Sequence, residues 1–238
     1  MKCALCLRTE ELQRSHVIPE FLFRALYDEK HRFHVISTAE AERNRYEQKG
    51  PREPLLCLNC EQQFSRYERY VSHALNGGIE LGYQCDGPAI VLSGLDYRKF
   101  RLFQLSVLWR ASVSRHEFFK YVSLGPHEEK LRLALFNEDT GRPDRYGCIM
   151  FALVHEGSLQ QDLVLQPERV RFSGLGGYRF VFGGLVWIYV VSSHRSQAGI
   201  ERGFLQEDGK AVVLMKNLNE FHDLIEMGGK LQAQGKLE

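Results

Sequence analysis

The chain has 238 residues, and its 31 Lys and Arg against 30 Asp and Glu give a formal net charge of +1. This balance removes the argument for nucleic-acid binding that a strongly basic domain would supply, so any such function must rest on a local site. Hydrophobic residues make up 44% and aromatic residues 11% of the chain, which disfavours disorder and allows one large domain or two small ones. No run of about 18 apolar residues is present, and the first residues lack the apolar core of a secretory signal. We therefore expect a cytoplasmic protein without a membrane partner.

Two Cys-x-x-Cys pairs, Cys3 with Cys6 and Cys57 with Cys60, lie close to the start of the chain. Because we expect a reducing compartment, a disulfide framework is disfavoured. Each pair has the spacing at which a tight turn presents two thiolates to one ion, and two such pairs complete the tetrahedral shell of a structural Zn²⁺. A thioredoxin-like redox role is the weaker alternative, since the βαβ context that it needs is absent.

The residues between and after the cysteine pairs predict a strand, a long insert and a helix. His16 lies in an apolar stretch that ends at Pro19, as expected for a short strand. A polar, charged insert runs from His31 to Pro54. After Cys60, apolar residues recur at helical spacing as far as the Gly77-Gly78 pair, which predicts a helix.

The remaining two thirds of the chain predict buried helices followed by strands. Helices are expected over about residues 96–140, and the first is so densely apolar that its Arg and Lys side chains would extend to solvent from a buried helix. Strand-length apolar runs over about residues 146–216 are separated by Gly183-Gly184 and Asp208-Gly209, which predicts two hairpins of an antiparallel sheet. The run from Gly184 to Val191 would be a central strand covered on both faces. A short helix is expected after Asn217.

The chemistry predicted for the first region centres on His16 and Glu61. If the four thiolates meet at one ion, Glu61 stands in the first turn of a helix beside the strand that carries His16, and a helix N-terminus attracts phosphate. This combination indicates metal-assisted phosphodiester hydrolysis, with His16 as general base and a divalent ion held partly by Glu61. We expect both side chains to face one solvent-accessible pocket. The plainer alternative is a half-buried strand histidine and a helix-capping glutamate.

Three motifs, Cys3-x-x-Cys6, His16-Val17-Ile18-Pro19 and Leu56-Cys57-x-x-Cys60-Glu61, together resemble the HNH, or ββα-metal (His-Me) finger, endonucleases. The resemblance is to their zinc-stabilised branch, which includes the recombination endonuclease VII type, and it covers about the first 75 residues. It implies a zinc-bound ββα finger with His16 as general base and Glu61 as the helix ligand of a catalytic Mg²⁺ or other divalent ion. Ser15 stands where the family usually has an acidic metal ligand, and Glu61 where it usually has His or Asn.

The sequence thus predicts an α+β chain with a zinc-stabilised finger at 1–80 and an α+β scaffold or recognition region at 81–238. The finger would hydrolyse nucleic acid, with DNA favoured over RNA, and the candidate phosphate contacts are Arg14, Arg66 and Arg69. Small enzymes of this family serve in restriction, phage defence and mobile elements, which is the context that the resemblance implies. The alternative is a catalytically silent zinc-binding module in a nucleic-acid-binding or assembly protein that has a protein partner.

Overall fold

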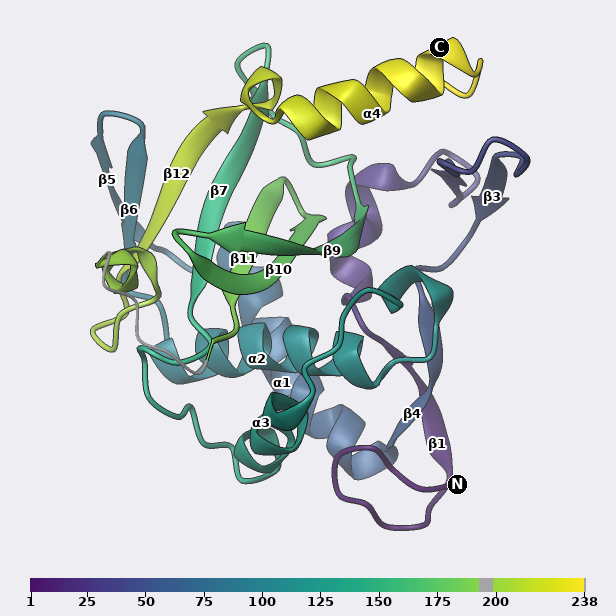
Figure 1. Cartoon of the computed structure of the whole chain (residues 1–238). Helices are drawn as coiled ribbons and strands as arrows, with labels where there is room; N and C mark the ends of the chain where they lie inside the picture. The colour runs from purple at the N-terminus through teal and green to yellow at the C-terminus, as the bar shows by residue number, and fades with distance from the viewer. Residues whose placement is uncertain (193–198, 238) are drawn as a thin grey trace.

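The computed structural model describes residues 1–192 and 199–237 and has the predicted mixed α+β architecture (Figure 1). The strands are β1 (Leu12–His16), β2 (Phe33–Val35), β3 (Arg45–Glu47), β4 (Arg52–Cys57), β5 (Gly82–Asp86), β6 (Ala89–Ser93), β7 (Cys148–His155), β8 (Ser158–Leu159), β9 (Leu165–Phe172), β10 (Leu175–Phe182), β11 (Leu185–Val190) and β12 (Ala211–Asn217). The α-helices are α1 (Leu58–Leu75), α2 (Tyr97–Val113), α3 (Pro126–Phe136) and α4 (His222–Ala233). Short 3₁₀-helices span Glu20–Leu26, Glu117–Phe119, Ile200–Gly203 and Leu218–Glu220. Within the described ranges, no helix is both long and apolar enough to cross a lipid bilayer.

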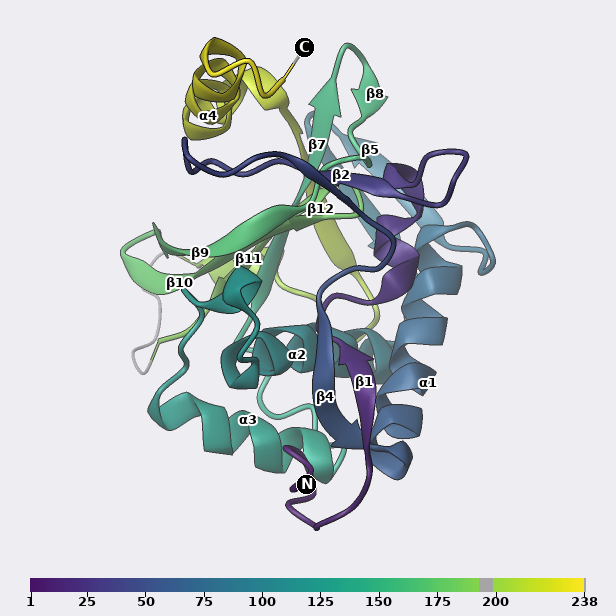
Figure 2. The same cartoon turned by 90° about the vertical axis from the view of Figure 1, so that its right-hand side faces the viewer.

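The N-terminal region is built on an antiparallel pair of strands, β1 and β4, that leads directly into α1 (Figure 2). Register pairs Leu12 with Cys57 at one end and His16 with Arg52 at the other. The predicted strand around His16 and the predicted helix after Cys60 are therefore confirmed. The insert between β1 and β4 forms a 3₁₀-helix and the small β2–β3 hairpin.

Helix α2 is the centre of the core, as its composition predicts. Every side chain from Phe100 to Ala111 is buried, because α1 and α3 pack on this helix and the large sheet covers it. Trp109 meets the ring of Phe64 on α1 edge-on, with ring centroids 6.2 Å apart. On the sheet side, Trp187 of β11 lies 6.3 Å from Phe100 between ring centroids. The same helix thus contacts both the N-terminal region and the sheet.

The described part of the chain builds one eight-stranded sheet in the order β5-β6-β12-β7-β11-β10-β9, with β8 paired to β7. The hairpin predicted at Gly183-Gly184 is confirmed as β10–β11, and all residues of β11 are buried, as expected for a strand covered on both faces. One face packs on α2, and the other is covered by residues that include Phe204, Phe221 and Leu224. The predicted C-terminal helix is α4.

Two predictions for the sheet are wrong. The Asp208-Gly209 turn does not join two strands but leads into β12 alone, and β12 runs parallel to β7. The absence of a helical crossover between consecutive strands does not exclude this pairing, because β8 to β11 all lie between β7 and β12 in the chain. The sheet also gains the β5–β6 hairpin, which lies outside the predicted range. Every residue of β5 is exposed, so this strand carries no alternating pattern to reveal it.

Candidate functional site

The four cysteines of the two pairs converge, as predicted. One sulfur from each of Cys3, Cys6, Cys57 and Cys60 lies within 4.8 Å of every other. The first pair sits in a turn in which Leu7 has a positive φ of 62° and donates its N–H to the carbonyl of Cys3 at 3.0 Å. Cys57 ends β4 and Cys60 lies in the first turn of α1, so the strand-to-helix junction forms the second half of the cluster.

The chemistry of the cluster fits a metal ion such as zinc. The thiols form no disulfide, and burial raises the pKa of both Cys57 and Cys60. A bound cation would offset that penalty and hold the sulfurs as thiolates. The backbone N–H of Cys57 points at the sulfur of Cys3, at 3.3 Å, and would support a thiolate there.

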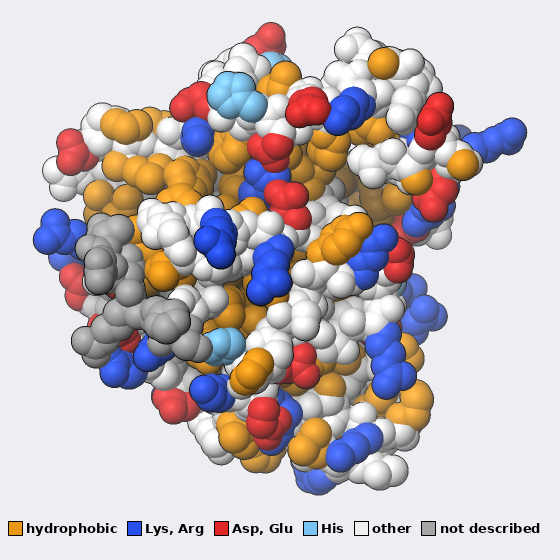
Figure 3. Space-filling view, in the orientation of Figure 1, with side chains coloured by type: hydrophobic (Ala, Val, Ile, Leu, Met, Phe, Trp, Pro, Cys, Tyr) orange, Lys and Arg blue, Asp and Glu red, His pale blue; other side chains and the backbone are white. Residues whose placement is uncertain are grey.

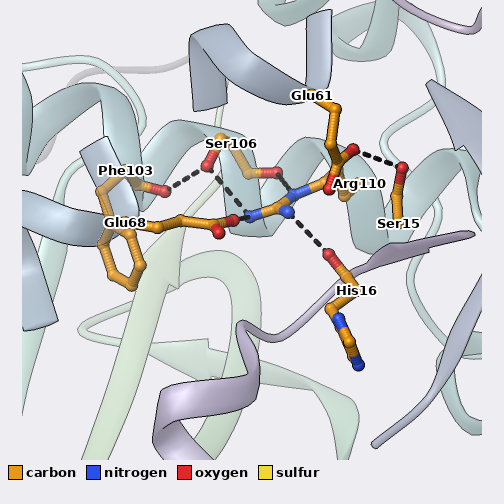
Figure 4. Close-up of polar contacts among 7 residues, drawn as sticks. All are labelled: Ser15, His16, Glu61, Glu68, Phe103, Ser106 and Arg110. Carbon is orange, nitrogen blue, oxygen red and sulfur yellow. Dashed lines mark hydrogen bonds and ion pairs between the residues drawn. The ribbon is translucent and has the colours of Figure 1, made fainter. Parts of the chain in front are cut away.

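Next to the cluster, Ser15 and Glu61 are in direct contact. Side chains alternate along β1, and Ser15 is a buried residue that faces α1. Its hydroxyl donates to Oε2 of Glu61 at 2.5 Å (Figure 4). Burial raises the pKa of Glu61, while the Ser15 hydroxyl and the charge of Arg110 act in the opposite direction. The two residues that the resemblance assigns to a metal site therefore do meet.

The side chain of Arg110 extends from α2 into the same place. It is only 1% exposed, and its Nη2 lies 2.7 Å from Oε1 of Glu68 on α1. Its Nη1 donates to the backbone carbonyl of His16 at 2.6 Å, and its Nε donates to the carbonyl of Ser106 at 3.3 Å (Figure 4). The prediction that the charged residues of this helix extend to solvent is therefore wrong for Arg110, which is buried and paired.

His16 faces the other way. Its imidazole points away from Glu61, because consecutive residues on β1 lie on opposite faces of the strand (Figure 4). Its Nε2 instead lies 2.8 Å from Oε2 of Glu20. The other carboxylate oxygen of Glu20, Oε1, accepts from the hydroxyl of Tyr27 and lies 3.4 Å from Nζ of Lys49. The prediction that His16 and Glu61 face one pocket is therefore wrong.

Burial is the main influence on His16 and lowers its pKa. The side chain is 22% exposed. The carboxylate of Glu20 favours the charged imidazole, and the nearby Arg52 opposes it. The net result is a histidine that stays neutral to lower pH than usual, next to a carboxylate that can orient its ring.

The three arginines predicted to contact phosphate do not share one surface. Arg14 lines a cleft of about 320 Å³ together with Lys49, Arg52 and His116. Arg66 and Arg69 line a separate hollow of about 550 Å³ along α1. Lys and Arg side chains are visible along the side of the molecule on which β1 and β4 lie (Figure 3). Only the Arg14 cleft adjoins the strand residues around His16, since Arg52 is the β-sheet partner of His16.

A catalytic divalent ion at Glu61 does not fit the residues present. Outside the four cysteines, no three His, Cys, Asp or Glu side chains converge on one point within the described residues. His16 is turned away, and the guanidinium of Arg110 already lies among the oxygens that surround the site. Sequence reasoning missed the partners Glu20 and Arg110. An arginine among the many apolar residues of α2 is the one signal that could have revealed a buried ion pair.

Comparison with known proteins gives no relative: no family model, no curated protein and no solved structure matches the chain.

Proposed function

We propose that the four cysteines bind one structural Zn²⁺ and that β1, β4 and α1 form a zinc-stabilised ββα finger of the HNH kind. The convergence of the four sulfurs supports the ion, because tetrahedral Cys₄ sites are characteristic of structural zinc. The junction of β4 and α1 supports the finger, since Cys57 ends the strand and Cys60 lies in the first turn of the helix that follows.

On this finger, the function that the geometry supports best is hydrolysis of phosphodiester bonds in nucleic acid, with DNA favoured over RNA. The observation that carries the proposal is the pairing of His16 with Glu20, whose Oε2 lies 2.8 Å from Nε2 of His16. The residue before His16 is Ser15, which contacts Glu61. If Nε2–H donates to Glu20, the other ring nitrogen keeps a lone pair that can take a proton from the attacking water. The cations of the adjoining cleft, Arg14 and Lys49 among them, would hold the phosphate.

A second candidate function is a catalytically silent zinc module that binds nucleic acid or a protein partner. The burial of Arg110 between α1 and β1 favours this second function, because the guanidinium lies where the resemblance would place the catalytic metal ion. In that case the Arg14 cleft would bind phosphate groups without cleavage.

Plasmid nicking by the zinc-loaded protein tests the proposal. His16→Ala should lower the rate by about 10²- to 10⁴-fold, the usual contribution of a general base. His222→Ala, an exposed residue at the start of α4, is the matched control and should leave the rate unchanged. Assays with and without added Mg²⁺, Mn²⁺ or Ni²⁺ cover the ion that the resemblance implies. Nicking that is equal in His16→Ala and wild type, or is absent under all conditions, would favour the silent module.

A further inference from the structure

The surroundings of Arg110 present a physical problem. A guanidinium that is 1% exposed, on a helix whose central residues are all buried, loses its hydration and needs compensation from the protein. The structure supplies it from three directions: the carboxylate of Glu68 on α1, the carbonyl of His16 on β1, and the carbonyl and hydroxyl of Ser106 on α2 itself. The ring of Phe64 lies under the guanidinium, 5.3 Å from centroid to Cζ.

These partners are the oxygen types that hold a hard divalent cation. Carboxylate, backbone carbonyl and hydroxyl or water oxygens make up such a shell, and here they come from separate elements that converge on one positive charge. Glu61 adds a second carboxylate, which accepts from Ser15 and lies beside the Arg110 side chain (Figure 4). The cation at the centre of this group is a side chain of the protein.

We propose that Arg110 is the resident cation of this oxygen cluster and occupies the position that a divalent ion would otherwise take. Its hydrogen bond to the carbonyl of His16 fixes the end of β1 from which the imidazole projects, so Arg110 is a positioning residue for His16. A divalent ion placed on the same oxygens would meet the guanidinium at contact distance and be repelled. The cysteine site is then the only metal site of the finger. The second consequence rests on the proposed function: cleavage that depends on His16 needs no added divalent ion.

Mn²⁺ binding to the zinc-loaded full-length protein, followed by electron paramagnetic resonance, tests the proposal without reference to activity. We expect the wild type to bind no stoichiometric Mn²⁺ and Arg110→Met, which removes the charge at similar length, to gain a site that is lost in Arg110→Met/Glu68→Gln. Arg101→Met is the matched control. Arg101 is also buried on α2, but it donates to the backbone carbonyls of Arg145 and Tyr146 and faces no carboxylate pair.

The outcomes separate the two proposals. One Mn²⁺ per wild-type chain that disappears in Glu61→Gln would overturn the role of Arg110. If Arg110→Met does not fold, the Mn²⁺ measurements on the wild type and on Glu61→Gln still show whether Arg110 excludes a metal ion. Nicking by the zinc-loaded wild type without added divalent ion supports the inference, and nicking only with Mg²⁺ or Mn²⁺ contradicts it. No nicking under any condition would refute the hydrolytic function, while the Mn²⁺ measurement would still decide whether Arg110 excludes a metal.

Discussion

Arg110 and Glu68 form an ion pair in which the guanidinium is 1% exposed and lies 2.7 Å from the carboxylate. Glu68→Gln keeps a hydrogen-bonding oxygen but leaves a buried guanidinium without its carboxylate. We expect a loss of about 3 kcal/mol in the free energy of unfolding, the lower end for a broken buried pair, because Glu68 is 22% exposed. Urea denaturation of the zinc-loaded protein measures it.

The control for this substitution is Glu226→Gln, which breaks the exposed pair of Glu226 with Lys230 on α4. Solvent screens that pair, so we expect little change in stability. Equal losses from the two variants would mean that Arg110 does not depend on Glu68 for its burial.

His16 carries the pH dependence of the proposed site. Burial lowers its pKa below the ordinary 6.5, so the folded state prefers the neutral imidazole. The stability contributed by this preference is present above pH 6.5 and is lost as the pH falls through the lowered pKa. An NMR titration of the His16 ring should give a midpoint below 6.5, and Glu20→Gln should lower it further, since the Glu20 carboxylate favours the charged form. A His16 midpoint above 6.5 would contradict this expectation.

Among the elements, the junction of β4 and α1 depends most directly on the metal. Cys57→Ser removes one of four sulfurs at the end of β4, and we expect the variant to lose its zinc and to unfold the finger or become insoluble. The wild type should contain about one zinc per chain, as elemental analysis can establish. Cys85→Ser, on the fully exposed β5, is the control and should keep its zinc. Folded, soluble protein without zinc would remove the basis of the finger proposal.

The elements show why sequence predicts some features and not others. Helix α1 was predictable because Phe64, Tyr67 and Val71 recur on one face, and they are buried as that pattern requires. The parallel pairing of β12 with β7 was not, because no local pattern records which non-consecutive strands become neighbours. The orientation of His16 could have been predicted from strand alternation alone, since Ser15 and its neighbour cannot both face α1.

The whole molecule shares a core that local patterns did not reveal. One hydrophobic cluster contains residues from both sides of the predicted boundary at residue 80, and Trp109 on α2 contacts Phe64 on α1. The charge of Arg110 likewise meets its carboxylate partner across that boundary. The partners are distant in sequence, so a motif confined to residues 1–80 indicates the cysteine site but not Arg110, which contacts Glu68 and His16 from α2.

This shared core predicts how the molecule responds to loss of zinc. Both tryptophans, Trp109 and Trp187, lie beyond residue 80 and are fully buried, so their fluorescence reports on the region outside the finger. Chelation should loosen α1, which packs on α2, and we therefore expect the tryptophan signal to unfold at a lower denaturant concentration in zinc-free than in zinc-loaded protein. Zinc binding would then increase the free energy of unfolding of both regions, 1–80 and 81–238. A tryptophan transition that does not move when zinc is removed would instead show that the regions 1–80 and 81–238 unfold independently.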